Sequence, residues 1–318
     1  MTLQEIVQSS SDFKSLQKEI AEGRGARTTL LISKDEDYSF EFARLLSCLV
    51  FNNGEWLENE NYQKVVANSH PDLKIYPTKN QLLVADSEEI VFESSIRPIF
   101  ADKKVFIIRN IEKSMEASQN KLLKTLEEPS KDAYFILTTT NANLVLPTIK
   151  SRCSKRELSK LDNKIISSYV ASCENVEIVT ALSDGLVGKA QKLSKIKNLK
   201  TLFEGVFDCV ARLSSSKEVL SFSKKLAPFK DDFNLFVEIL SMLMEELIFL
   251  RAGTSDLLRL PHYKDRLELV KKDYSFEAIA EIQKLISQAV KEMSFNCNFT
   301  LVVENLLLNI LEVKYLCK

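Results

Sequence analysis

The first 160 residues alternate between short apolar runs and amphipathic stretches. Three apolar runs bounded by polar loops predict buried strands at residues 28–33, 104–108 and 133–139. A shorter run, residues 73–76, follows His-Pro-Asp and predicts a fourth strand. Apolar side chains recur at helical spacing in four further stretches: residues 3–22 (with a break at 9–11), 40–51, 87–100 and 118–128. Strands and helices that alternate at this spacing predict a parallel sheet covered by helices.

Beyond about residue 160 the pattern predicts no further strand. Two long helical stripes of apolar residues stand out: Phe233, Phe236, Ile239, Leu240, Leu243 and Leu247, and then Leu301, Val302, Leu306, Ile310 and Val313. The chain is therefore predicted to have an α/β N-terminal half and an all-helical C-terminal half.

The amino-acid composition argues against several classes of protein. Lys and Arg total 43 against 44 Asp and Glu, which argues against a surface that binds nucleic acid over its whole extent. Glycine and proline number only seven each, which disfavours sandwiches and barrels. No uncharged apolar run approaches membrane-spanning length, and the polar N-terminus lacks a signal-peptide core, so a soluble, cytoplasmic protein is expected. The six cysteines form no closely spaced pair, and no metal or cofactor is predicted.

A parallel α/β domain raises the question of a nucleotide site. A phosphate loop needs glycines after a strand and a Lys at the helix start. The segment after the first strand, residues 33–39, has no glycine and contains Asp35, Glu36 and Asp37 in a row. After the strand at 104–108, Arg109 stands where a carboxylate for Mg²⁺ is expected. The sequence thus predicts a nucleotide-binding fold that has lost its nucleotide chemistry.

Two motifs carry a family resemblance. Asn-Lys-Leu-Leu-Lys-Thr-Leu-Glu-Glu-Pro at 120–129 and Leu-Pro-Thr-Ile-Lys-Ser-Arg-Cys at 146–153 resemble the bacterial DNA polymerase III clamp-loader family, which has the AAA+ fold. Further similarity extends the resemblance along the chain: residues 70–73, 182–190 and 296–308. The resemblance implies a degenerate AAA+ (P-loop NTPase-like) domain at 1–158, a helical lid at 159–203 and an all-α, oligomerising collar at 204–318.

The resemblance also implies a role. A member with Ser-Arg-Cys but no ATP site is expected to be a stator without intrinsic ATPase activity. Its partners would be the ATPase (gamma/tau) and delta subunits of a hetero-pentameric ring, and through the complex the sliding clamp and primer-template DNA, with no membrane partner. Two alternatives stay open: a divergent ATP-hydrolysing subunit of the same ring, and a ring-fold interaction protein outside replication.

Arg152 is the main candidate site residue. The resemblance implies that it acts as an arginine finger in trans, on ATP held by a neighbouring subunit, where such a residue stabilises charge on the transferred phosphoryl group. The competing interpretation is an ordinary salt bridge at a strand end. In the same motif, Ser151 is expected to act as a local cap and Cys153 as a small buried hydrophobe, not a nucleophile.

Other polar features have simpler interpretations. Many related proteins carry a four-cysteine zinc module between the first helix and His70; here only Cys48 remains, so packing around Phe51, Trp56 and Tyr62 is expected instead. Gly188 aligns with the family's ATP-sensing lid arginine. Residues 138–141 are expected to hydrogen-bond at a strand end, and His70 to organise a turn. Two cationic runs, residues 150–164 and 189–200, are expected to be mainly solvated surface. The alternative is phosphate contact: with the neighbour's ATP or DNA backbone for the first run, and with DNA backbone for the second.

Overall fold

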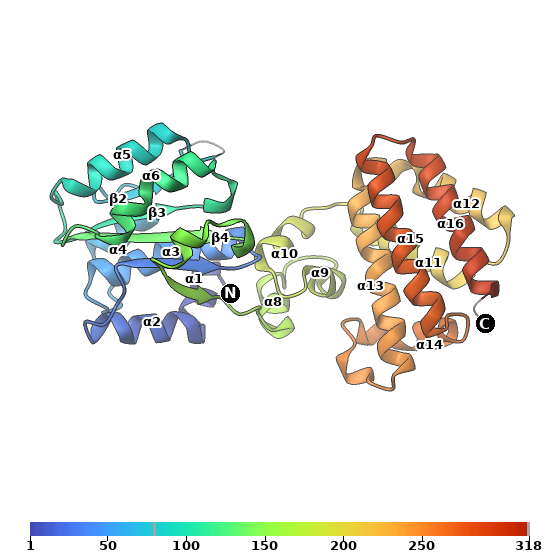
Figure 1. The fold of residues 1–318 in the computed structure, drawn as a ribbon. Coiled ribbons are helices and arrows are strands. Elements are labelled where there is room, and N and C mark those ends of the chain that lie inside the picture. Colours follow the sequence, from blue (N-terminus) through green and yellow to red (C-terminus); the bar gives the residue numbers. More distant parts are fainter. Residues whose placement is uncertain (79–80, 317–318) are drawn as a thin grey trace. The chain divides into compact units, whose positions relative to one another are not determined.

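A computed structural model describes residues 1–78 and 81–316 of the chain, which divides into two compact units. The first comprises Met1–Tyr169 with Gly185–Lys189, and the second comprises Val170–Asp184 with Ala190–Lys318. The N-terminal unit is α/β and the C-terminal unit is helical, as the sequence pattern predicts (Figure 1). The three-domain division at 158 and 203 stays a prediction.

The first unit is built on a five-stranded parallel sheet in the order β2-β3-β4-β1-β5. Its strands are β1 (Thr28–Ile32), β2 (Leu73–Tyr76), β3 (Lys104–Ile108), β4 (Ala133–Thr139) and β5 (Ser154–Glu157). The first four coincide with the apolar runs. The sequence pattern misses β5, because this edge strand reads Ser-Lys-Arg-Glu and has no apolar residue; it pairs with β1 through backbone groups alone.

Helices cover both faces of this sheet. Figure 1 shows α5 (Val84–Ser95) and α6 (Glu116–Glu127) on one face, and α1 (Leu3–Ser9), α2 (Ser11–Ala21), α3 (Glu36–Phe51) and α4 (Glu60–Val66) toward the other. The short helices α7 (Pro147–Lys150) and α8 (Asn163–Tyr169) follow β4 and β5. Helix α5 ends at Ser95, five residues before the end of the predicted stretch. Pro98 disfavours helical backbone at Arg97, so the helix does not extend to residue 100.

Aromatic side chains fill the region between the end of α3 and His70, as the sequence predicts. The Trp56 ring meets Phe13 and Tyr62 edge-on, with centroids 5.8 and 5.5 Å apart. The His70 ring stacks on Phe51 at 4.1 Å, and its Nδ1 accepts the Asp72 N–H at 3.2 Å. Burial lowers the pKa of His70, which favours the neutral ring that this contact requires. The expected aromatic packing and turn-organising histidine are therefore both present.

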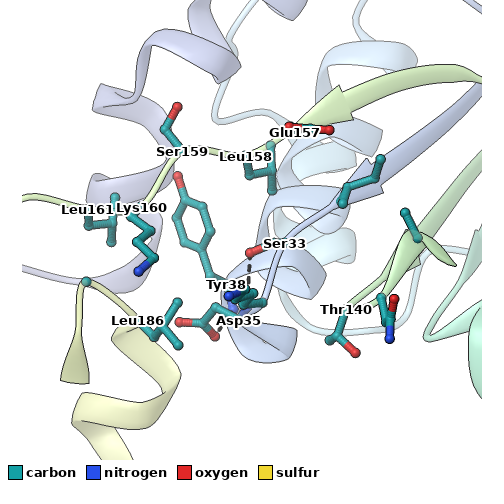
Figure 2. Close-up of a pocket in the computed structure, with 15 residues that line it drawn as sticks. Ser33, Asp35, Tyr38, Thr140, Glu157, Leu158, Ser159, Lys160, Leu161 and Leu186 are labelled. Carbon is teal, nitrogen blue, oxygen red and sulfur yellow. Dashed lines mark hydrogen bonds between the residues drawn. The ribbon is translucent and has the colours of Figure 1, made fainter. Parts of the chain in front are cut away.

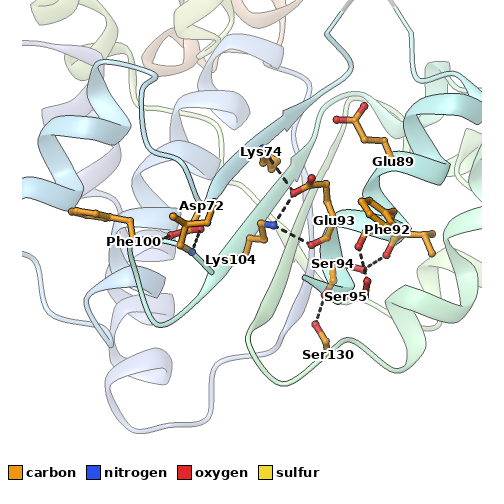
Figure 3. A network of polar contacts seen from close by, with 12 residues as sticks. Asp72, Lys74, Glu89, Phe92, Glu93, Ser94, Ser95, Phe100, Lys104 and Ser130 are labelled. Atoms are coloured by element: carbon orange, nitrogen blue, oxygen red, sulfur yellow. Dashed lines mark hydrogen bonds and ion pairs between the residues drawn. The ribbon is translucent and has the colours of Figure 1, made fainter. Parts of the chain in front are cut away.

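Buried charges fix the loop before β3 (Figure 3). The fully buried Asp72 carboxylate accepts three backbone N–H groups, from Ile99, Phe100 and Ala101, at 2.7, 2.7 and 2.8 Å. The buried Lys104 donates to Glu93 Oε2 at 2.7 Å. The hydrogen bond and charge of Lys104 hold the pKa of Glu93 below its ordinary value, although burial opposes this. Helix α5 and the loop are thus tied to the sheet by charge-assisted bonds.

The second unit consists of helices: α9 (Val176–Ser183), the end of α10 (Val187–Leu193), α11 (Leu199–Arg212), α12 (Ser216–Leu226), α13 (Phe233–Arg251), α14 (Lys264–Lys271), α15 (Phe276–Ser294) and α16 (Phe299–Leu316). The apolar helix α13 packs against α11 and α15, and α15 packs against α16. The stripes predicted around 233–247 and 301–313 thus lie on α13 and α16. Within residues 1–78 and 81–316, none of the helices combines the length and apolar character that a membrane span requires.

Candidate functional site

A pocket of about 330 Å³ lies where β1, β4 and β5 end. Parallel α/β sheets bind their ligands at the carboxyl ends of the strands, so this is the position of a nucleotide crevice. Ser33 and Asp35 lie at the start of α3, Thr140 follows β4, and Leu158 and Lys160 follow β5 (Figure 2). Gly185 and Leu186, far along the chain, complete the lining.

The Asp35 carboxylate occupies the N-terminus of α3. It is 6% exposed, and its Oδ1 accepts the backbone N–H of Tyr38 at 3.0 Å, which caps the helix. Its own N–H donates to Ser33 Oγ at 3.1 Å. A helix N-terminus after a strand is the place where phosphate binds in nucleotide-binding folds. Here a side-chain anion of the protein already lies there, so the residues do not fit a bound triphosphate.

Gly188 approaches the same carboxylate from the start of α10. Its backbone N–H donates to Asp35 Oδ2 at 2.8 Å. A Cβ at this position would lie 2.6 Å from Asp35 Oδ1 and 2.6 Å from Asp37 Oδ2. Nearby, the Leu161 N–H donates to the Gly185 carbonyl at 3.2 Å. Glycine is therefore required at 188 by close packing, in the position that the family resemblance aligns with an ATP-sensing arginine.

The residues after β3 form an internal ion-pair cluster around Glu36. The Glu36 carboxylate accepts from Asn110 Nδ2, from Lys113 Nζ at 3.0 Å and from Arg109 Nη2 at 3.5 Å. Burial opposes ionisation of Glu36, but the hydrogen bonds from Lys113 and Asn110 and the charges of Lys113 and Arg109 outweigh it and lower its pKa. Arg109 also lies over the Phe40 ring, 4.0 Å from its centroid. A cation is thus fixed where a magnesium ligand would be needed.

The end of β4 is likewise occupied by internal hydrogen bonds. Thr138 Oγ1 accepts the Asn110 N–H at 3.1 Å. Glu112 Oε1 accepts from both the N–H and the hydroxyl of Thr140, at 3.0 and 2.6 Å. The Asn141 N–H donates to Thr139 Oγ1 at 3.2 Å. The strand-end hydrogen bonding that the sequence predicts for 138–141 is confirmed.

Arg152 lies between α7 and β5, and its side chain is 28% exposed. Its Nε and Nη2 both lie 2.8 Å from Glu127 Oε2, at the end of α6, and its Nη1 donates to the Thr148 carbonyl at 2.9 Å. The salt bridge that the sequence offers as the competing interpretation is therefore present in this chain.

The residues on either side of Arg152 in the sequence, Ser151 and Cys153, have structural surroundings that match their predicted roles. Ser151 Oγ donates to the Thr148 carbonyl at 3.1 Å, one turn back along α7. Cys153 is buried, and burial raises the pKa of its thiol to about 12, so the thiolate that a nucleophile requires is disfavoured.

Lys150 and Arg156, two further cations of the run at 150–164, also have partners within the chain. Lys150 Nζ donates to the Ala142 carbonyl at 2.9 Å, and Arg156 pairs with Glu19. Lys160 lines the pocket, whereas Lys155 is exposed. This pattern favours a mainly structural use of the run.

Sequence reasoning brought Asp35, Arg109 and Arg152 forward but missed three of their partners. Gly188 meets Asp35 from 153 positions away, and Glu127 meets Arg152 from 25 positions away. In the sequence Glu36 stands out only as one of three consecutive carboxylates, yet it is the acceptor for the residues that follow β3. No local sequence signal predicts these contacts. The one partial signal is that the segments after β1 and after β3 carry opposite charges.

Comparison with known proteins gives the chain its class. The solved structure of a DNA polymerase III gamma subunit-related protein from Thermotoga maritima matches it with a TM-score of 0.52 and 17% identity, over 96% of this chain and 100% of the other. At this identity the match concerns the fold. Together with the parallel sheet and the helical C-terminal unit, it confirms the predicted AAA+ class.

Sequence comparison adds similarity to particular subunits of DNA polymerase III. Residues 8–162 match the family model described as DNA polymerase III, delta subunit. The DNA polymerase III subunit delta' of Haemophilus influenzae is 35% identical over 38% of each chain, and that of Bacillus subtilis 23% over 79% of each. The H. influenzae subunit tau/gamma is 32% identical over 36% of this chain and 17% of its own length. The chain thus spans well under half of the two H. influenzae relatives. The chain is therefore similar to delta-prime-type subunits of the DNA polymerase III clamp loader, most clearly over residues 8–162.

Proposed function

We propose that this chain is the stator of a DNA polymerase III clamp loader: a cytoplasmic subunit that binds no ATP, has no ATPase activity of its own, and presents Arg152 to ATP on an adjacent subunit. The observation that carries the proposal is the Asp35 carboxylate at the N-terminus of α3. A triphosphate placed there would meet a buried negative charge that already holds the Tyr38 and Gly188 N–H groups.

The charge pattern around β3 supports the same conclusion. A Mg²⁺ ion would have to displace Arg109 and Lys113 from Glu36, because both cations form ion pairs with that carboxylate. Recruiting Glu36 as a metal ligand would therefore break an existing ion-pair cluster. A subunit that lacks both the phosphate-binding position and the metal-binding position is expected not to hydrolyse ATP.

The partially exposed Arg152 supports the contribution in trans. A guanidinium has five N–H donors in a rigid planar fork, which suits it to phosphate. The resemblance supplies the partners of the proposal: gamma/tau ATPase subunits and a delta subunit in a hetero-pentameric ring, the sliding clamp, and primer-template DNA. The helical C-terminal unit would provide the collar through which the ring assembles.

Two measurements test this function. The isolated chain is titrated with ATP and Mg²⁺ by calorimetry, and no binding is expected. ATP turnover by the reconstituted ring, with clamp and primed DNA, is then compared for wild type, Arg152→Ala and Lys155→Ala. Lys155 is an exposed cation three positions along the chain, so its removal controls for the change in net charge.

The proposal predicts at least tenfold slower turnover for Arg152→Ala in a normally assembled ring, and wild-type turnover for Lys155→Ala. Tenfold corresponds to about 1.4 kcal/mol of activation free energy. Equal turnover of all three rings would make Arg152 structural and the protein a scaffold only. ATP hydrolysis by the isolated chain would instead favour a divergent ATPase, and failure to join any clamp-loader subunit would favour an interaction protein outside replication.

A further inference from the structure

Two acceptors of its own chain, Glu127 and Thr148, hold the Arg152 guanidinium. Nε and Nη2 form the edge that faces Glu127 Oε2, and Nη1 reaches the Thr148 carbonyl. Three of its five N–H donors are used by these contacts within the described chain, which leaves two for another acceptor. An arginine held in this way is oriented yet still able to bind an anion through its remaining donors.

Glu127 is placed to orient Arg152 without burying it. Glu127 is the last residue of α6, its side chain is 55% exposed, and α6 is anchored in the core through Leu122 and Leu126. Exposed ion pairs of this kind contribute little net stability, because water screens the attraction. The main effect of the ion pair is therefore to orient the Arg152 guanidinium, and neutralising its charge is the smaller effect.

We infer that Glu127 is a positioning residue for Arg152: it holds the guanidinium in the conformation that meets the phosphate of a neighbouring nucleotide. This inference rests on the proposed function of Arg152. A long side chain loses conformational freedom when it is ordered, and that loss opposes binding. With Glu127 in place, part of this ordering precedes assembly, so the neighbouring phosphate meets a guanidinium already oriented.

A double-mutant cycle in the reconstituted ring separates this role from a general structural one. ATP turnover is measured for Glu127→Ala, Arg152→Ala and the double variant, with Glu128→Ala, the adjacent exposed carboxylate, as matched control. Glu127→Ala is expected to slow turnover about two- to tenfold, the scale of ordering one long side chain. Glu127→Gln, which keeps an acceptor oxygen, is expected to lie between Glu127→Ala and wild type.

The decisive comparison is made in the Arg152→Ala background. Because Glu127 acts through Arg152, Glu127→Ala should have no further effect there, and Glu128→Ala should have none in either background. The inference is overturned by an equal slowing in both backgrounds, by unchanged turnover of Glu127→Ala, or by faster turnover, which would make Glu127 a restraint on Arg152. If Arg152→Ala itself has no effect, it is the proposed function that fails.

A second measurement needs neither ATP nor partners. In the ¹⁵N-labelled isolated chain, the Nε–H resonance of Arg152, identified by its loss in Arg152→Ala, should be protected from solvent exchange by the bond to Glu127. Glu127→Ala should raise its exchange rate at least tenfold, whereas Glu128→Ala should leave it unchanged. An Nε–H group that exchanges equally fast in wild type and Glu127→Ala would overturn the inference, whatever the turnover shows.

Discussion

The contact between Gly188 and two aspartates allows a quantitative test by replacing Gly188 with alanine. The added Cβ would lie 2.6 Å from an oxygen of Asp35 and 2.6 Å from an oxygen of Asp37, far inside van der Waals contact. The backbone of 188 or the carboxylates must therefore move apart. The bond that breaks first is the one between the Gly188 N–H and Asp35, now 2.8 Å long.

The expected magnitude has two opposing parts. A hydrogen bond to a charged group contributes about 1.5–3 kcal/mol. Alanine favours the helix by about 1 kcal/mol over glycine, and Gly188 lies within α10. Gly188→Ala should therefore destabilise the protein by about 0.5–2 kcal/mol. Gly205, inside α11, is the matched control: a Cβ there would meet only Leu226, at 3.9 Å, so Gly205→Ala should stabilise by up to about 1 kcal/mol.

Urea unfolding followed by two probes distinguishes the outcomes. Trp56, the single tryptophan, lies in the first unit, so its fluorescence reports the unfolding of that unit, while far-UV circular dichroism reports helices in both. Gly188→Ala should lower the midpoint of the Trp56 transition, and Gly205→Ala should raise the dichroism midpoint. A Trp56 midpoint that stays constant or rises in Gly188→Ala would refute the argument that the aspartates require glycine at 188.

Three further predictions concern buried and ionised groups. Asp72→Asn should lower the free energy of unfolding by about 1–3 kcal/mol, because three N–H groups lose a charged acceptor; in urea unfolding Asp102→Asn should differ little from wild type. Iodoacetamide at pH 8 should label the exposed Cys297 well before Cys153, whose buried thiol has its pKa raised to about 12, and peptide mapping reads the order. The pKa of Glu36 is lowered from its ordinary value of 4.5, so ionised Glu36 stabilises the folded protein above pH 4.5. This stability is lost as the pH falls through the lowered pKa of the folded state. Glu36→Gln should therefore lose less stability on acidification than wild type.

The fold is largely readable from apolar periodicity, because buried strands must be apolar on both faces. Strands β1, β3 and β4 show this directly. The polar edge strand β5 is not predictable in the same way, since backbone pairing with β1 defines it. Helix α3 starts earlier than its apolar stripe suggests because Asp35 caps it, and an aspartate ahead of a helical stripe is a local capping signal.

The candidate site divides along similar lines. The motif around Arg152 and the unfavourable charges of Asp35 and Arg109 are local sequence features, and each indicates chemistry by residue type. What the side chains contact depends on how distant segments meet. The bond between Asp35 and Gly188 and that between Arg152 and Glu127 arise only when the chain has folded, so no spacing rule gives them.

The capping carboxylate of Asp35 has a thermodynamic consequence. A bound ligand stabilises a protein by an amount that rises with its concentration and vanishes when it dissociates or reacts. An anion that is part of the polypeptide has no dissociation constant, so its bonds to Tyr38 and Gly188 do not depend on the concentration of a ligand that supplies them. If the chain binds no ATP, as proposed above, the attachment of the segment around Gly188 is independent of the ATP concentration.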